Sequence, residues 1–130
     1  MKRIMLTLVA CASVLAVALS TAPAAAADPT GLRMSSRAAA GYEDCPAGYS
    51  CYFDGLNGTG AFIYADHGCD YYDLAGSGWD NRISSIYNRG SSKVFVYTGR
   101  GTSFDVHGWM PVGQRGNYNT NDIDGILVGC

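Results

Sequence analysis

The fold is decided by a stretch near the middle of the chain, Trp79-Asp80-Asn81-Arg82-Ile83-Ser84-Ser85-Ile86. Asp and Asn favour turn conformations and bond to nearby backbone groups, so the first polar pair predicts a turn. A strand follows it, and strict alternation buries Ile83 together with either Ser85 or Tyr87, with Ser84 on the opposite face. The carboxylate, amide, carbonyl and hydroxyl oxygens are also the hard ligands that calcium prefers. Turn cap and cation site are therefore both open interpretations.

Strand signals surround this stretch on both sides. Short runs rich in aromatic and β-branched residues alternate with glycine turns, and no window shows sustained helical periodicity. The runs are Ser50-Cys51-Tyr52-Phe53, Ala61-Phe62-Ile63-Tyr64, Ile83 to Tyr87, Lys93-Val94-Phe95-Val96-Tyr97, Ser103-Phe104-Asp105-Val106 and Ile126-Leu127-Val128. This spacing predicts an all-β sandwich or barrel.

The two halves of the chain form a weak internal repeat. Each half has an aromatic strand, a glycine turn, a second aromatic strand and a long loop that ends in an acid/amide element. The second element is Asn121-Asp122-Ile123-Asp124-Gly125-Ile126-Leu127, which we align with the first at an offset of about 41 residues. Two such units predict two Greek-key motifs packed as one sandwich.

The N-terminus has the pattern of a secretory signal. A basic start, an apolar run from Ile4 to Leu19 and an A-x-A site ending at Ala27 predict a signal peptide over 1–27. Residues 28–43 are small and polar without a clear period, and we expect a flexible N-terminal arm or a short pro-segment there. The folded domain is then 44–130, in a secreted, extracellular protein.

Four cysteines remain after Cys11 leaves with the signal. An even number in an exported chain predicts two disulfides, with three possible connectivities. We favour Cys45–Cys51, which closes a tight loop, and Cys69–Cys130, which ties the C-terminus to the middle of the chain. A zinc site is disfavoured because no C-x-x-C pair is present.

Charge and motif content argue against several function classes. Without Lys2 and Arg3, seven basic residues face 11 acidic ones, a net charge of −4. This argues against nucleic-acid or anionic-membrane partners, which require basic patches. His67 and His107 have no zinc-hydrolase spacing, and no serine lies in G-x-S-x-G. We therefore expect a non-enzymatic protein, a monomer, with no required cofactor.

Two resemblances add to this interpretation. Asp80 to Ser85 fits the [ND][ND]-x-x-[ST]-S element of the microbial βγ-crystallin superfamily, whose domains contain two Greek-key repeats. Cys45-Pro46-Ala47-Gly48-Tyr49-Ser50-Cys51-Tyr52 resembles the start of the actinobacterial metalloproteinase-inhibitor family, which has the same βγ-crystallin-like fold. The second resemblance implies inhibition of an extracellular metallopeptidase by occupation of its cleft. The alternative is a non-inhibitory structural module with weak calcium binding.

The resemblances also imply site residues. In calcium-binding relatives the element supplies a carbonyl and a hydroxyl, and the hairpin of the other repeat completes the site. In this chain the resemblance implies the Arg82 carbonyl and the Ser84 hydroxyl as these ligands, with Asp80 and Asn81 nearby. A second site pairs Asp54 with the second element, where the hydroxyl position has become Gly125. Inhibitory relatives hold a substrate-like loop with a small disulfide that this chain lacks. Our candidate inhibitory loop is instead Asp70, Tyr71, Tyr72, Asp73 and Leu74, with Tyr72 or Leu74 filling a specificity pocket.

Overall fold

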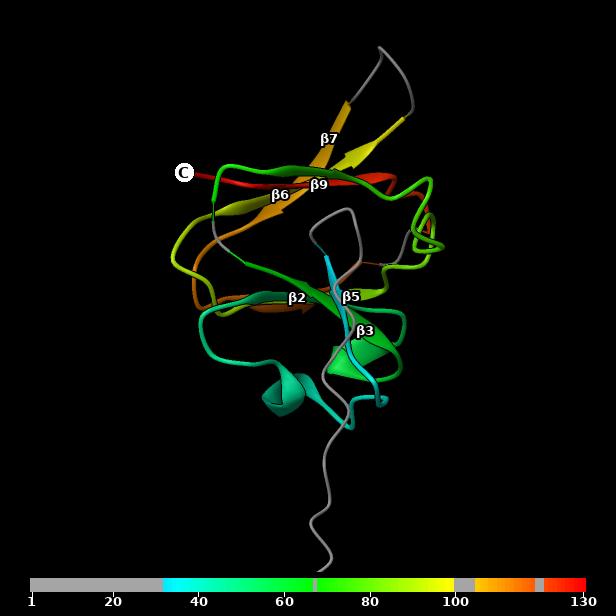
Figure 1. Cartoon of the computed structure of the whole chain (residues 1–130), viewed down its shortest axis with the longest axis vertical. Helices are drawn as coiled ribbons and strands as arrows, with labels where there is room; N and C mark the ends of the chain where they lie inside the picture. The colour runs from blue at the N-terminus through cyan, green and yellow to red at the C-terminus, as the bar shows by residue number, and fades with distance from the viewer. Residues whose placement is uncertain (1–31, 67, 100–104, 119–120) are drawn as a thin grey trace, which may run out of the picture.

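Two antiparallel β-sheets lie face to face in the computed structural model, which describes residues 32–66, 68–99, 105–118 and 121–130 (Figure 1). The only helical elements in these ranges are the 3₁₀ turns η1 (Tyr42–Asp44) and η2 (Leu56–Gly58). The prediction of an all-β sandwich is confirmed. No helix in the described part of the chain has the length and apolar character needed to span a membrane. The predicted signal peptide lies outside the described residues.

The first sheet contains five strands, in the spatial order β1, β3, β2, β5, β8. Their bounds are Arg33–Met34 (β1), Phe62–Ala65 (β3), Ser50–Phe53 (β2), Ser85–Asn88 (β5) and Arg115–Asn117 (β8). The second sheet contains four strands, in the order β4, β9, β6, β7. Their bounds are Tyr71–Asp73 (β4), Gly125–Val128 (β9), Val94–Thr98 (β6) and Asp105–Met110 (β7), and the β6–β7 ladder has a register shift between Val96 and Tyr97.

The strand orders reveal two equivalent four-strand units. Strands β2, β3, β4 and β5 of the first unit correspond to β6, β7, β8 and β9 of the second, because the orders β3-β2-β5-β8 and β7-β6-β9-β4 match position by position. Each unit therefore gives its third strand to the other unit's sheet. The assignment of these units to the βγ-crystallin type remains a prediction.

The strand register corrects the predicted offset of the repeat. Phe53 pairs with Ser85 in the first sheet, and Tyr97 pairs with Gly125 in the second. Ser85 and Gly125 are therefore equivalent, and the offset between the two elements is 40 residues instead of 41. The acid/amide pairs alone do not distinguish an offset of 40 from one of 41 residues. A shift of one residue moves every side chain of a strand to the other face, so the burial of the isoleucines is needed to choose between the two offsets.

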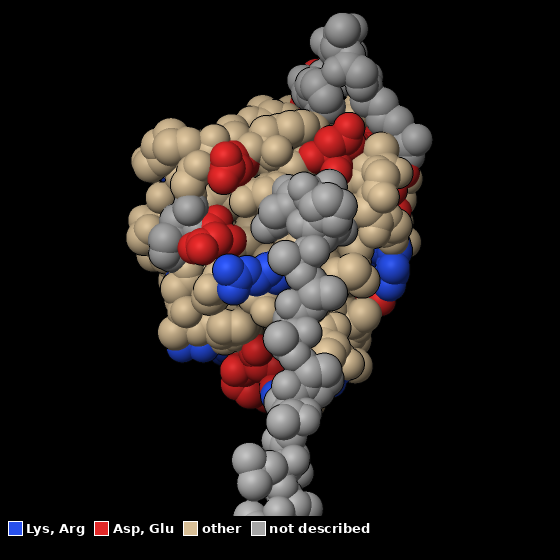
Figure 2. All heavy atoms as spheres, viewed as in Figure 1, with Lys and Arg blue, Asp and Glu red and all other residues tan. Residues whose placement is uncertain are grey.

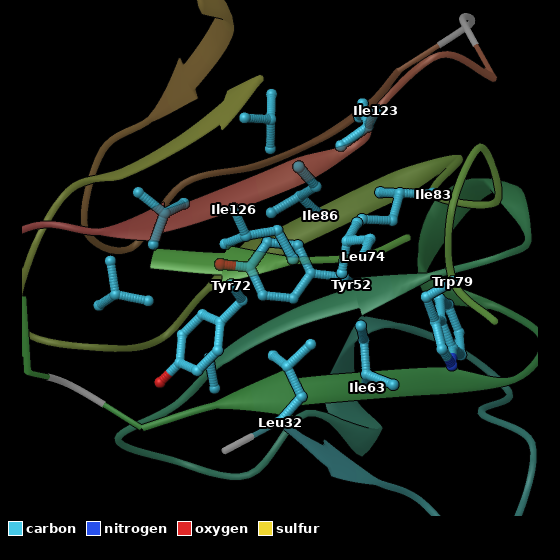
Figure 3. Packing of buried hydrophobic residues seen from close by; sticks show 14 of the residues in the cluster. Leu32, Tyr52, Ile63, Tyr72, Leu74, Trp79, Ile83, Ile86, Ile123 and Ile126 are labelled. Atoms are coloured by element: carbon cyan, nitrogen blue, oxygen red, sulfur yellow. The ribbon is translucent and has the colours of Figure 1, made fainter. Parts of the chain in front are cut away.

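The main core lies between the sheets (Figure 3). Tyr52 lies at its centre, close to Ile86 from the same sheet and Ile126 from the opposite one. Burial raises the pKa of the Tyr52 phenol, and its hydroxyl donates a hydrogen bond to Ser50 Oγ at 2.9 Å. The other large buried side chains between the sheets are Leu32, Ile63, Leu74, Trp79, Ile83, Val94, Val96 and Ile123.

Both favoured disulfides are present. Cys45 bonds to Cys51 with their Cα atoms 5.8 Å apart, and Cys69 bonds to Cys130 with their Cα atoms 4.7 Å apart. The first holds a short segment against the outside of the first sheet. The second joins the start of β4 to the end of β9. In the chain-entropy model these bonds stabilise the fold by about 2 and about 4 kcal/mol, respectively.

The expectation of a flexible arm over 28–43 is wrong for its described part, residues 32–43. Leu32 is only 1% exposed and belongs to the main core. Strand β1 pairs with β3, and Ala39 forms an isolated bridge with Gly60. The segment has no sequence period because a two-residue strand and one bridge are too short to produce one. Residues 28–31 lie outside the described ranges.

We therefore predict that Leu32→Ala lowers the free energy of unfolding by about 2–4 kcal/mol, since it leaves a cavity between the sheets. Met34→Ala is the matched control, because Met34 lies two residues further along, in β1, and is 44% exposed. It should change stability by less than about 0.5 kcal/mol. Urea denaturation measures both, and equal midpoints for Leu32→Ala and the parent protein would restore the flexible arm.

Candidate functional site

The first acid/amide element forms a tight turn within the first repeat, between β4 and β5. The Arg82 amide donates to the Trp79 carbonyl at 3.3 Å, and Asn81 has a left-handed backbone with φ 57°. Asn tolerates this conformation better than most residues because its short side chain bonds locally. The Asn81 amide donates to the Ile123 carbonyl at 3.1 Å. The turn of the first repeat is thus bonded directly to the element of the second.

The Arg82 side chain organises the surface of this turn. Its guanidinium donates to the Gly78 carbonyl at 3.0 Å and to Asp54 Oδ2 at 2.9 Å. It also lies 4.6 Å from the Trp79 ring centroid, a cation–π distance. The expected pairing of Asp54 with the second element is therefore corrected: the Asp54 carboxylate is held by Arg82 of the first. Sequence could not show this, because it depends on where the hairpin after β2 folds.

Ser84 and Ser85 have different roles. The Ser84 backbone bonds to both neighbours, donating to the Phe53 carbonyl and accepting from the Tyr118 amide, each at 2.8 Å. Ser85 is fully buried, and its hydroxyl donates to the Gly55 carbonyl at 2.6 Å and accepts from the Gly58 amide at 2.9 Å. This hydroxyl fastens the hairpin after β2 to β5. The fastening was not among the sequence-based predictions, and the signal for it was a polar residue at a predicted buried position.

The second repeat replaces this fastening with a different one. At the corrected offset, Asp124 stands at the position of Ser84 and Gly125 at that of Ser85. The Asp124 amide donates to the Tyr97 carbonyl at 2.8 Å, and its Oδ2 accepts from the Gly99 amide at 2.6 Å. The expected equivalence of Ser84 with Gly125 is therefore corrected, because Asp124 stands at that position; a role for Asp124 in calcium binding is a prediction. The Tyr71 hydroxyl occupies the space that a side chain at 125 would need.

Metal binding by these elements remains a prediction. Within the described ranges, no group of three or more His, Cys, Asp or Glu side chains is placed to hold a metal ion. Asp80, Asn81, Arg82 and Ser84 lie together in one turn, with Asp54 joined to them through Arg82. The guanidinium beside Asp54 already neutralises the carboxylate that a cation would need.

The candidate inhibitory loop is an edge strand. Tyr71–Asp73 forms β4, which pairs with β9, and the Leu74 amide continues this ladder by donating to the Asp124 carbonyl at 3.0 Å. Tyr72 and Leu74 point into the core and are buried. The idea that either side chain fills a specificity pocket is therefore wrong. Within β4, Tyr71 and Asp73 face outward because successive side chains of a strand alternate between faces, and Asp70, just before the strand, is also exposed.

The surface charge is dispersed. Figure 2 shows acidic and basic side chains in small separate groups between larger uncharged areas. Two ion pairs join Arg37 to Asp44 at 2.8 Å and Arg82 to Asp54 at 2.9 Å. Several cations lie over aromatic rings, among them Lys93 at 4.6 Å from the Trp109 ring centroid.

Comparison with known proteins gives one result. The sequence model that describes peptidase inhibitor family I36 matches residues 38–109, which is more than half of the chain. The matched range extends from the segment before η1 to Trp109 in β7. No curated protein and no solved structure matches the chain.

We predict that Ser85→Ala lowers the free energy of unfolding by about 2 kcal/mol, because it leaves the Gly58 amide and Gly55 carbonyl without their buried partner. Ser84→Ala is the matched control and should cost less than about 0.5 kcal/mol, since Ser84 bonds through its backbone. Denaturant unfolding of both variants tests this, and an equal loss in the two would contradict the fastening role of Ser85.

Proposed function

The chain belongs to peptidase inhibitor family I36, and we propose that it inhibits an extracellular metallopeptidase by occupying the substrate cleft. The family match over 38–109 is the observation that supports this proposal most strongly. It includes the Cys45–Cys51 segment, the acid/amide element and the β6–β7 hairpin. The metallopeptidase class follows from the resemblance of the Cys45 to Tyr52 segment to metalloproteinase inhibitors.

The rigidity of the fold supports an inhibitory role. An inhibitor that is already ordered before binding loses little conformational entropy in the complex. Here two disulfides and a core shared by two sheets hold the surface in place. A rigid, disulfide-tied sandwich is also suited to survive among extracellular peptidases, because cleavage requires local unfolding.

We further propose that the protein is exported and acts as a monomer. The signal pattern over 1–27 supports export, and two disulfides agree with an oxidising compartment. A net charge of −4 over residues 28–130 favours a protein partner over nucleic acid or an anionic membrane. Membership in an inhibitor family supports a non-catalytic role.

The first test is a titration of thermolysin with the purified, host-processed protein, whose N-terminus is checked by mass spectrometry. We expect stoichiometric loss of peptidase activity at micromolar inhibitor, because a preorganised surface of this kind binds tightly. Subtilisin, a serine peptidase, is the class control. Inhibition of subtilisin alone would reassign the target class, and activity of both enzymes at saturating protein would reject the inhibitor proposal.

Weak calcium binding is a second candidate property. The observation that favours it is Asp124, which brings a carboxylate to the ligand position of the second element. The site offers few charged ligands, and the Arg82 guanidinium lies beside Asp54. We therefore expect a calcium dissociation constant near the millimolar values found in extracellular modules.

We therefore predict that millimolar calcium raises the melting temperature of the protein and that Asp124→Asn reduces the increase. The Asn side chain retains an oxygen that can accept from Gly99, so stability without calcium should change little. Arg82→Ala should enlarge the response by freeing the Asp54 carboxylate. Magnesium at equal concentration is the control for ionic strength. Equal melting temperatures with and without calcium in all three proteins would end this hypothesis.

A further inference from the structure

The outer side of the second sheet exposes a continuous set of large apolar side chains. Strand pairing places Tyr71 beside Leu127, Leu127 beside Phe95, and Phe95 beside Trp109, which makes one row across all four strands. Cross-strand partners share a face of the sheet, so these side chains point the same way. Tyr97 and its partner Val106 lie in the next row, and the Tyr97 ring is 6.0 Å from that of Tyr71 in an edge-to-face contact. We call these six residues the apolar face.

In the apolar face Tyr71, Val106 and Trp109 are exposed, and Phe95, Tyr97 and Leu127 are partly exposed. Trp109 is 53% exposed and Tyr71 is 42% exposed, while the inward neighbours Val94, Val96 and Ile126 are buried in the core. Isolated surface apolar residues are ordinary, whereas a contiguous group marks a surface that binds a partner.

The equivalent side of the first sheet is covered by the chain itself. There Phe53 and Phe62 are buried beneath residues 39–49, with the Tyr42 ring 5.8 Å from that of Phe53 and the Tyr49 ring 5.2 Å from that of Tyr64. The Cys45–Cys51 bond fixes this cover, and Figure 1 shows it on the side of the first sheet away from the second. At the corresponding strand positions, Cys51 is replaced by Phe95 and Phe53 by Tyr97. Within the described ranges, no equivalent segment covers these two.

We propose that the apolar face is the surface on which the target metallopeptidase docks, an inference that rests on the proposed inhibitory function. Exposed Trp and Tyr side chains are the types that contribute most binding energy at protein interfaces. Here they stand on paired strands, so they need little ordering on binding. The Cys69–Cys130 bond joins two of those strands, which further limits their motion.

Charge at the two ends of the face orients the partner. Asp73 pairs across from Gly125, which pairs in turn with Tyr97, so the Asp73 carboxylate lies at the end of the face that carries Tyr97. The pKa of Tyr71 is raised by burial and by the nearby carboxylates of Asp73 and Asp124, which agrees with an acidic end. Lys93 lies at the opposite end, over Trp109. An acidic end complements the positive charge of a metal-containing cleft, whereas the aromatic rings fit apolar subsites beside it.

The test compares inhibition of thermolysin by Trp109→Ala and Tyr71→Ala with inhibition by a matched control, Leu56→Ala. Leu56 is 49% exposed and lies in the η2 turn of the first repeat, outside the apolar face. We expect the inhibition constant of Trp109→Ala to rise about 30-fold or more, as for a central aromatic residue of an interface, and that of Leu56→Ala to stay within about threefold.

A second measurement guards against misfolded variants. Hydrogen exchange of the parent protein with and without thermolysin should slow at β4 and β7 in the complex and stay unchanged at β1. Size-exclusion chromatography of the free proteins identifies self-association through the same face. Unchanged inhibition by both face variants, or a dimer that Trp109→Ala dissociates without loss of inhibition, would overturn the inference while leaving the inhibitor function intact. Absence of inhibition by the parent protein and by Leu56→Ala would remove the proposed function, and the inference with it.

Discussion

The structure depends on the burial of equivalent isoleucines around the two acid/amide elements. Ile83 and Ile86 of the first repeat and Ile123 and Ile126 of the second are fully buried between the sheets. Because strand side chains alternate, burying Ile86 and Ile126 sets the register of β5 and β9 and with it the direction of their neighbours, while Ile83 and Ile123 enter the core from the segments just before these strands. The turn at Asn81, the buried hydroxyl of Ser85 and the carboxylate of Asp124 all take their positions from that register.

From this shared frame the two repeats have diverged in chemistry. In the first, Ser85 ties down a hairpin, and residues 39–49 seal the outer side of the sheet under a disulfide. In the second, Gly125 leaves room for the Tyr71 hydroxyl, and the outer side remains open. One repeat therefore serves stability and the other presents a surface. Such a division suits an inhibitor, which needs a rigid support behind the residues that contact its target.

Membership in peptidase inhibitor family I36 fits this division, but it does not by itself locate the contact. The small second-half disulfide expected of inhibitory relatives is absent from this sequence. Rigidity in the second repeat comes instead from the Cys69–Cys130 bond and from strand pairing across four strands. The physical requirement, a surface ordered before binding, is thus met by other means in this chain.

The features that could be predicted from the sequence are local ones: the β character of each run, the turn at Asp80 and Asn81, and the tight Cys45–Cys51 loop. These follow from residue type and short spacing, whereas Cys69–Cys130, separated by 61 residues, was one favoured pairing among three connectivities. Only the tertiary structure decided that Leu32 enters the core, that Tyr72 and Leu74 point inward from an edge strand, and that Asp54 pairs with Arg82. Each of these depends on which strands exchange between the sheets, because burial and pairing arise from segments far apart in the chain. The apolar face is the clearest case, since its side chains come from four strands whose proximity no local pattern records.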